Sequence, residues 1–393
     1  MDEDSQKLGM VCPLKQDIFL NSHFFQWFDW RFGCDRWQDS IFLEENKLEN
    51  QKTYRALDLG FGYTKFTRGH CDTNNKLDVS SFPSYAAPVI GDGILDTGVL
   101  NNLSLVKVSA EGQDFFIGED VRRAADGVAR QLLEASFFKS PQYLALARGA
   151  FSFMKIPAHG NIDVLTLGLP LNIYRDKGVI EHITKALSGT HNIPDIINGK
   201  DQTKTIVIKD LHIIPQVVGS LIFMSHESGL NEIISDQQNL TIDVGYGTLL
   251  WLVTDGFSPL PARSNGNMGG VSSILQKVVR AMDSQATTNI TILDRLDKAL
   301  LSKKPSIKLN GSDVEIEKYH GVLQSAVNEN LTELIRGIGN TQDIDNIFLT
   351  GGGAHLYLNA IKMAFPGRKI NTSEKLSRFT NVYGFQLLAQ SEE

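Results

Sequence analysis

The sequence predicts an α/β protein built from two similar domains, and three observations support this prediction. The chain has 393 residues, more than the roughly 250 to 300 at which a single hydrophobic core stops growing. Beyond residue 52, strand-type and helix-type segments alternate, which is typical of α/β domains. A strand, glycine turn, strand pattern at 54–69 recurs at 239–254, which indicates a duplicated domain.

The composition indicates a globular protein in water. Hydrophobic residues make up 42% of the chain and charged residues 21%. No run reaches the roughly 18 apolar residues that span a bilayer. The N-terminus, Met1-Asp2-Glu3-Asp4, lacks the positive start of a secretory signal. We therefore expect a cytoplasmic protein without integral membrane association.

The net charge and the cysteine positions argue against direct DNA binding, a disulfide framework and a cysteine metal site. A formal net charge of -7 disfavours broad contact with nucleic-acid phosphates, because nonspecific affinity comes from Lys and Arg. We expect no direct DNA contact, so that any DNA is reached through a partner. Cys12, Cys34 and Cys71 are odd in number and widely spaced, which argues against a disulfide framework or a CxxC metal site.

Residues 1–52 differ from the rest of the chain. They contain three of the four tryptophans within an aromatic stretch that has no clear period. An anchor for a membrane surface normally carries Lys and Arg on its polar face, whereas this segment mixes both signs of charge. We expect a poorly ordered N-terminal extension of unknown role.

The expected elements of the first half begin with a hairpin. Strands at 54–60 and 63–69 flank a tight glycine turn, and residues 81–85 are expected to form a loop or edge segment broken by Pro83. Helical and strand patterns then alternate. Helices are expected near 119–126, 141–154, 176–187 and 216–225, and strands at 162–167 and 203–215.

The second half starts with the same hairpin pattern. Strands at 239–244 and 248–254 flank its glycine turn, and residues 345–350 form a further buried strand. The expected helices of this half lie at 268–282, 290–301, 315–336 and 354–365.

Both hairpins place an acid at the end of an apolar strand, just before a glycine turn. The two runs are Asp58-Leu59-Gly60-Phe61-Gly62-Tyr63-Thr64-Lys65 and Asp243-Val244-Gly245-Tyr246-Gly247-Thr248. Glycines let backbone N–H groups approach phosphate oxygens, and the acids are placed to hold a hydrated Mg²⁺ ion. One such turn is a common hairpin connector. Two at the starts of matching halves predict a phosphate site.

Two further features fit a nucleotide. Lys65 follows Asp58 by seven residues and can approach phosphates as a point charge; the alternative is an ordinary exposed strand lysine. Residues 347–356, Ile-Phe-Leu-Thr-Gly-Gly-Gly-Ala-His-Leu, run from an apolar strand into glycines at a helix start. Such glycines let the backbone lie flat against a nucleoside, although a triple glycine can also be a flexible loop.

Competing motifs are absent from the sequence. There is no G-x-x-x-x-G-K-[ST], and the dinucleotide fingerprint lacks its third glycine after Gly60-Phe61-Gly62. The histidines form no spaced metal cluster, and no G-x-S-x-G elbow is present.

In this order and at these separations, the three elements resemble the actin, sugar-kinase and heat-shock ATPase superfamily. Residues 58–65 look like its first phosphate motif, 243–248 like its second, and 349–354 like its adenosine motif. The likeness is greatest to the plasmid-segregation actins of the ParM/StbA type, and among them to protein D of the PRTRC system. That protein has a sequence pattern similar to residues 56–65 and to the following Phe82-Pro83-Ser84.

The resemblance implies an actin-like ATPase fold, with two duplicated RNase H-like domains around a nucleotide cleft. It places domain I at 53–237 together with a C-terminal helix at 377–390, and domain II at 238–376. Residues 1–52 stay unexplained.

The resemblance also implies ATP and Mg²⁺ as cofactors and assigns residues to them. Asp58 and Asp243 would bind the metal and act in catalysis, and Gln216 matches the residue that positions the attacking water. An amide orients water but has no useful pKa, which fits slow hydrolysis. The expected nucleotide contacts are Gly60, Gly62, Tyr63, Thr64, Lys65, Gly245, Gly247, Thr248, Gly269, Gly270, Gly351, Gly352, Gly353 and Ala354.

Two of these assignments have alternatives or qualifications. ParM carries glutamate at the position of Gln216, so the resemblance implies that Gln216→Glu is tolerated. Residues 267–270 lie where the superfamily has a nucleotide-contacting helix start, and they are equally well explained as a helix cap.

Three functions remain open at this point. The first is an ATPase that self-associates into filaments for plasmid segregation or maintenance, with a DNA-binding adaptor protein as a possible partner. The second is a non-polymerising adaptor switched by ATP. A small-molecule kinase on the same fold is third, because it needs a catalytic aspartate where this chain has Gln216.

Overall fold

In the computed structural model, Asn50–Glu393 form one compact unit. The predicted extension lies outside the described residues except for Lys52, as do all three cysteines. The described residues are 52–70, 76–89, 103–124, 135–196, 199–229, 234–373 and 377–391.

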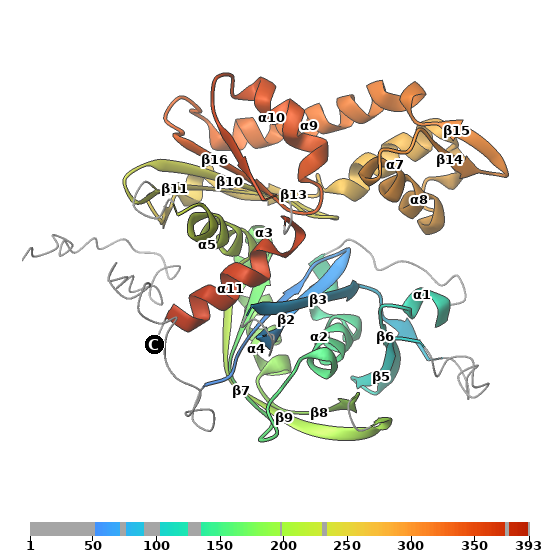
Figure 1. Cartoon of the computed structure of the whole chain (residues 1–393), viewed down its shortest axis with the longest axis vertical. Coiled ribbons are helices and arrows are strands. Elements are labelled where there is room, and N and C mark those ends of the chain that lie inside the picture. The colour runs from blue at the N-terminus through green and yellow to red at the C-terminus, as the bar shows by residue number, and fades with distance from the viewer. Residues whose placement is uncertain are drawn as a thin grey trace, which may run out of the picture. The chain divides into compact units, whose positions relative to one another are not determined.

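The first sheet has six strands in the order β3-β2-β1-β7-β9-β8 (Figure 1). The central pair, β1 and β7, is parallel, while β1 and β2 form the predicted antiparallel hairpin. The strands are β1 (Tyr54–Leu59), β2 (Tyr63–His70), β3 (Leu77–Pro83), β7 (Asn161–Leu169), β8 (Gly189–Asp195) and β9 (Gly199–Pro215).

The second sheet follows the order β12-β11-β10-β16-β17, and β13 also pairs with β11. Again an antiparallel hairpin, β10 with β11, lies beside a parallel neighbour, β16. The strands are β10 (Gln238–Val244), β11 (Leu249–Asp255), β12 (Ser258–Pro259), β13 (Asn265–Asn267), β16 (Asn346–Thr350) and β17 (Ile370–Thr372).

The repeated pairing places two acids at equivalent positions. Asp58 is the second-to-last residue of β1 and pairs with Gly168 of the parallel strand β7. Asp243 is the second-to-last residue of β10 and pairs with Thr350 of the parallel strand β16. The duplication predicted from the two hairpins is therefore visible in the strand register.

Ten α-helices are described, most of them close to their predicted bounds. Several begin at side-chain caps, such as Ser140 before α2, Asp176 before α4 and Asn289 before α8, each of which accepts a bond from a first-turn N–H. The helices are α1 (Val121–Ala124), α2 (Pro141–Phe153), α3 (Leu171–Tyr174), α4 (Lys177–Leu187), α5 (Gln216–Ser228), α7 (Val271–Met282), α8 (Ile290–Leu301), α9 (His320–Ile338), α10 (Ala354–Ala364) and α11 (Thr380–Ser391).

Each sheet has its own hydrophobic core, and two helices connect them. The first core is built from residues between 57 and 208, and the second from residues between 240 and 365. Helix α5 contacts strands of both sheets, and α11 packs along α5 and against β1, β2 and β7 (Figure 1). Within the described residues, none of the helices has the length and apolar character that crossing a membrane requires.

Residues 81–85 were expected to form a loop or edge segment, and the edge strand β3 continues to Pro83, which an edge strand accommodates because one side needs no donor. Other local predictions were wrong. The helix expected from 315 begins at His320, because residues 312–315 pair with 306–309 as the hairpin β15 (Ser312–Glu315) and β14 (Ser306–Leu309). The hairpin β5 (Leu105–Ala110) and β6 (Gln113–Gly118), and strand β8, were not predicted.

Candidate functional site

The first glycine turn carries a buried charged pair. Asp58 and Lys65 are opposite each other in the β1–β2 hairpin, and the Lys65 ammonium lies 2.6 Å from Oδ2 of Asp58. The Lys65 side chain is only 17% exposed. The alternative of an ordinary exposed strand lysine is therefore wrong.

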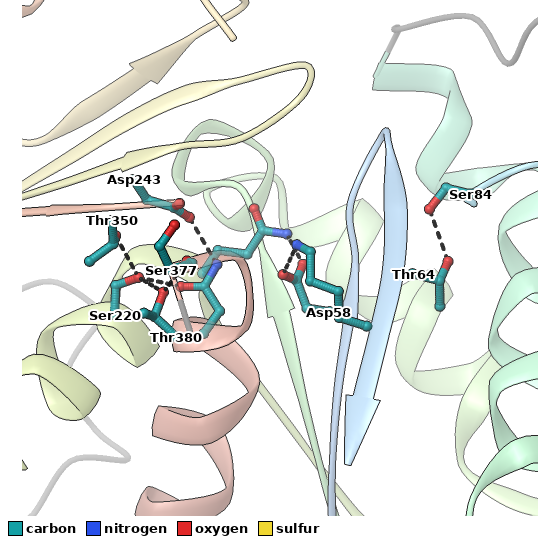
Figure 2. Close-up of polar contacts among 11 residues, drawn as sticks. Asp58, Thr64, Ser84, Ser220, Asp243, Thr350, Ser377 and Thr380 are labelled. Atoms are coloured by element: carbon teal, nitrogen blue, oxygen red, sulfur yellow. Dashed lines mark hydrogen bonds and ion pairs between the residues drawn. The ribbon is translucent and has the colours of Figure 1, made fainter. Parts of the chain in front are cut away.

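Gln216 completes the surroundings of Asp58. It is the first residue of α5, directly after the long strand β9, and β9 runs parallel to β7 beside β1. Its amide Nε2 donates to Oδ1 of Asp58 at 2.6 Å, in a buried setting (Figure 2). The two carboxylate oxygens of Asp58 thus have different partners, Lys65 and Gln216, and the Gln216 carbonyl oxygen remains available as an acceptor for water.

The second turn is held by the start of α7. The N–H groups of Gly270, Val271 and Ser272 donate to the carbonyls of residues 247, 245 and 246 respectively. Since the peptide unit is planar and trans, each bound carbonyl directs the N–H of the next residue the opposite way. The N–H groups of residues 246–248 therefore point away from α7 together. Successive N–H groups on one side of a turn form an anion-binding concavity.

The first turn is braced by the segment after β3. The N–H of Ser84 donates to the carbonyl of Gly62 at 2.9 Å, which turns the N–H of Tyr63 to the opposite side. The Thr64 hydroxyl bonds the Ser84 hydroxyl at 2.9 Å, on the far side of the strand from Asp58 (Figure 2). Thr64 therefore supports the turn through its side chain and does not join the acid cluster.

Asp243 belongs to a buried polar network. Asn381, the second residue of α11, donates its Nδ2 to Oδ2 of Asp243 at 2.8 Å and accepts the Ser220 hydroxyl at 2.7 Å (Figure 2). The Ser220 hydroxyl also bonds Thr380 at 2.8 Å and accepts from Thr350 at 2.9 Å. The network connects Asp243 to both helices that lie between the sheets.

Electrostatics differ between the two acids. Burial raises the pKa of Asp243, the hydrogen bond from Asn381 and the charge of Lys65 lower it in part, and the negative charge of Asp58 raises it further. The negative charges of the two carboxylates therefore repel each other. Lys65 bonds one of them directly, so the pair keeps an excess of negative charge. Such a site fits a divalent cation.

The donor set suits Mg²⁺ better than an all-protein cage. Within the described ranges, no group of three or more His, Cys, Asp and Glu side chains is arranged to hold a metal. Mg²⁺ typically keeps several waters and uses one or two carboxylates together with substrate phosphates. Asp58 and Asp243, beside two turns with inward N–H groups, match that requirement.

The glycine run after β16 packs against the end of β10. Gly351 has a φ of +88°, and a Cβ there would overlap the backbone of Val244 and the carboxylate of Asp243. Gly353 donates its N–H to the carbonyl of Val244 at 2.9 Å. Gly352 is exposed, and a Cβ there would meet only Arg378, at 3.7 Å. The run is thus held beside Asp243, with Gly352 on its open side and Ala354 starting α10.

Three further residues that were predicted to contact the nucleotide lie at or near the two glycine turns. The N–H of Gly269 donates to Oδ1 of Asn267, and the Gly269 carbonyl accepts from the Tyr357 hydroxyl. Gly270 is the N-cap residue of α7 and lies against residues 246–248. Tyr63 is 37% exposed, and the Arg378 guanidinium lies 5.8 Å from its ring centroid.

The sequence interpretation missed Asn381 and its partners. Asn381 is 138 residues from Asp243, and Ser220 lies one helical turn after Gln216. Neither has a motif of its own, because small polar residues in helices are common. The one available signal was Ser220, a polar residue one turn after Gln216 within the otherwise apolar run 217–224.

Comparisons with known proteins bear on the fold of the chain. Residues 56–219 match the family described as the actin like proteins N terminal domain. Among curated proteins, no match to the chain was found.

Solved structures match over most of the chain. An archaeal actin homolog, Ta0583, is 18% identical, covers 86% of this chain and 99% of its own, and gives a TM-score of 0.67. The same protein in complex with ADP gives 0.63 at 19% identity, with 86% and 99% covered. The apo ParM protein of pSK41 gives 0.62 at 17% identity, with 86% and 97% covered.

A third protein, seen in a 15-stranded ParM filament from Clostridium botulinum, is 19% identical, with 87% of this chain and 99% of its own covered and a TM-score of 0.61. The fold is therefore actin-like, as the motifs predicted.

Proposed function

We propose that this chain is an actin-like, Mg²⁺-dependent ATPase that hydrolyses ATP slowly and assembles into filaments for plasmid segregation or maintenance. The observation that carries the proposal is the convergence of Asp58, Lys65, Gln216 and Asp243 beside two turns with oriented N–H groups. The actin-like fold, a similar protein solved with ADP and another solved as a filament support it.

The phosphates are bound by both halves of the chain. The N–H groups of residues 246–248 and of Tyr63 donate to phosphate oxygens, and Lys65 supplies a positive charge. Asp58 and Asp243 hold the hydrated Mg²⁺, which when bound neutralises phosphate charge and orients the phosphates. Gly60 and Gly245 keep the turns free of side chains near the phosphates.

Gln216 positions the attacking water. Its Nε2 is engaged by Asp58, which fixes the side chain and leaves Oε1 to accept a hydrogen bond from water. An amide does not take up the proton, so the residue orients the nucleophile without acting as a base. Hydrolysis is therefore slow, which suits a filament whose lifetime is set by ATP turnover.

The adenosine lies along Gly351, Gly352, Gly353 and Ala354. Domain I comprises residues 53–237 with the helix at 377–390, and domain II residues 238–376. Within plasmid-segregation actins we place the chain nearest to PRTRC protein D, on the run at 56–65 and Phe82-Pro83-Ser84. An adaptor protein supplies the contact with DNA, since the chain itself is acidic.

Light scattering and phosphate release, recorded together on the purified protein, test the proposal. With Mg-ATP, scattering should rise above a threshold protein concentration and then decline as phosphate accumulates. Mg-ADP and ATP with EDTA should give no rise, and Asp58→Ala should give neither signal. Phosphate release without scattering at any concentration would replace the filament by an ATP-switched adaptor, and absence of release would end the ATPase proposal.

A further inference from the structure

Each glycine turn carries an aromatic residue before its second glycine. Phe61 precedes Gly62, and Tyr246 precedes Gly247. Phe61 packs against the core of the first sheet, and Tyr246 packs against the core of the second. The duplicated fold thus places the two aromatic residues at equivalent positions in the two halves.

The two turns touch each other reciprocally through these residues. A Cβ added at Gly62 would lie 2.5 Å from Cβ and 2.7 Å from Cγ of Tyr246. A Cβ added at Gly247 would lie 2.7 Å from Cδ2 and 2.9 Å from Cβ of Phe61. Real Cβ atoms essentially never come closer than 3.0 Å to a neighbour. Each aromatic residue therefore fills the space that a side chain at the opposite glycine would need.

Backbone conformation does not explain these two glycines. Neither Gly62 nor Gly247 has a φ in the left-handed region that favours glycine. Alanine is therefore excluded at both positions by the opposing aromatic residue and not by backbone strain.

Both aromatic residues are anchored. The Phe61 ring centroid lies 5.6 Å from those of Phe137 and Phe138, and Phe138 in turn lies 5.5 Å from Tyr143. On the other side, the backbone carbonyl of Tyr246 accepts from Ser272 in α7.

We propose that Phe61 and Tyr246 are positioning residues that interlock the two turns and fix the distance between them. The inference rests on the proposed ATP site and deepens it. Because the phosphate chain is bound by turns from separate sheets, its affinity depends on their spacing, and a misplacement of about 1 Å is costly. Gly62 and Gly247 are glycine because each receives the aromatic residue of the opposing turn.

Gly60 offers a matched control within the same turn. A Cβ there would meet the Tyr63 carbonyl at 3.1 Å, the Lys65 ammonium at 3.6 Å and Asp58 Oδ1 at 3.8 Å. None of these three nearest atoms belongs to the second turn. A methyl group at Gly60 crowds the phosphate side, whereas a methyl group at Gly62 meets Tyr246.

The test is second-site rescue in the full-length protein. Gly62→Ala, Tyr246→Gly and the double variant are compared by melting temperature without nucleotide and by calorimetric titration with Mg-ATP. Gly62→Ala should melt roughly 5 °C lower and bind ATP about tenfold more weakly. The double variant should regain part of both losses, because Tyr246→Gly removes the two clashing atoms. Adding Tyr246→Phe, which keeps the clashing Cβ and ring, should not relieve the losses of Gly62→Ala.

The Gly60→Ala control distinguishes a clash with the opposing turn from crowding of the phosphate side by a methyl group. Gly60→Ala should lose ATP affinity, and adding Tyr246→Gly should not restore it. If Tyr246→Gly fails to restore the melting temperature of Gly62→Ala, the interlock is wrong. If it restores the melting temperature but not the affinity, the turns interlock without positioning ATP.

If wild-type protein binds no Mg-ATP, the proposed function fails, while the melting temperatures still decide whether the turns interlock.

Discussion

Asp58 and Asp243 hold equivalent positions in the two sheets but differ in their partners. Asp58 is bonded by Lys65 and Gln216, whereas Asp243 has Asn381 as its side-chain donor. A buried carboxylate with a neutral partner costs stability when it is charged, because it loses hydration that one amide does not replace. The raised pKa of Asp243 expresses this cost.

Asp243→Asn should therefore stabilise the nucleotide-free protein. Removing the buried charge while keeping the Asn381 bond should raise the free energy of unfolding by about 1 kcal/mol at neutral pH. The same change should remove the melting-temperature increase that Mg-ATP gives. Differential scanning calorimetry with and without Mg-ATP measures both effects.

The stabilisation should depend on pH. Since the folded pKa of Asp243 lies above its unfolded value, the wild type is relatively more stable when this group is protonated and loses that contribution as pH rises through the folded pKa. The advantage of Asp243→Asn should thus shrink as the pH falls. An advantage that grows towards acid pH would contradict the assignment of the cost to this carboxylate.

If Gln216 only orients water, its removal should affect turnover and not ATP binding. Gln216→Ala should slow hydrolysis on the order of 100-fold, because the water loses its acceptor. The Kd for Mg-ATP should stay within about threefold of wild type, since the ground-state phosphates are held by the turns. Single-turnover phosphate release and calorimetric titration check the two parts. Wild-type hydrolysis in this variant would remove Gln216 from the mechanism.

The structure also changes one expectation that rested on the resemblance. Gln216→Glu was expected to be tolerated, but Gln216 donates a hydrogen bond to Asp58 at 2.6 Å. A glutamate has no amide donor, and its carboxylate would face another carboxylate. We now expect Gln216→Glu to weaken the site at neutral pH, and the same single-turnover assay with Gln216→Ala as reference measures it.

At the level of elements, α5 and α11 cross with direct backbone contact. A Cβ at Gly384 would overlap the carbonyl group of Gly219, and Phe385 fills the space beside Gly168 and Gly219. The two helices therefore approach as closely as glycine permits, next to the network of Ser220 and Asn381.

Gly384→Ala should separate this helix pair. The added methyl group would meet the backbone of Gly219, which cannot move aside as a flexible side chain can. We therefore expect a loss of about 2 kcal/mol or more in the free energy of unfolding. Gly321→Ala is the matched control, because Gly321 is also in a helix and a Cβ there meets nothing within 4 Å. Urea unfolding of both variants tests this, and equal stabilities would contradict the crossing.

Sequence patterns predicted the central elements of the two sheets and most helices for a physical reason. The runs at 162–167 and 345–350 centre on Ile, Val, Leu and Phe, as strands in a buried sheet require, and α8 has an Asn289 cap followed by a clear apolar stripe. Strands β5 and β6 were missed because their hairpin combines short, mixed segments around the positive-φ residues Glu111 and Gly112.

Site residues could be predicted from the sequence where they lie next to their own motif. Asp58 and Asp243 each stand beside their own glycine turn, so strand and turn signals mark them together. The bond between Gln216 and Asp58 was not predictable from spacing, because it depends on β9 lying parallel to β7. Asn381 depends on the return of the last helix to α5.

For the whole molecule, the site requires both sheets at once. Each half contributes one acid, one turn and one aromatic residue, and in the proposed site neither half alone would surround a phosphate chain. A ligand that bridges two halves stabilises the native state by mass action, by about 2.7 kcal/mol at a ligand concentration 100 times its Kd. Stabilisation by Mg-ATP is therefore the direct consequence of the central claim.

The most direct measurement is the melting temperature of the full-length protein with Mg-ATP, ATP plus EDTA, and Mg²⁺ alone. Mg-ATP should raise the melting temperature by a few degrees, because the unfolding entropy grows with chain length and each kcal/mol then shifts the midpoint by about 1 to 2 °C. EDTA should remove most of the increase, and Mg²⁺ alone should give little. Equal melting temperatures in all three conditions at millimolar ligand would contradict a nucleotide site formed by Asp58, Asp243 and the two turns.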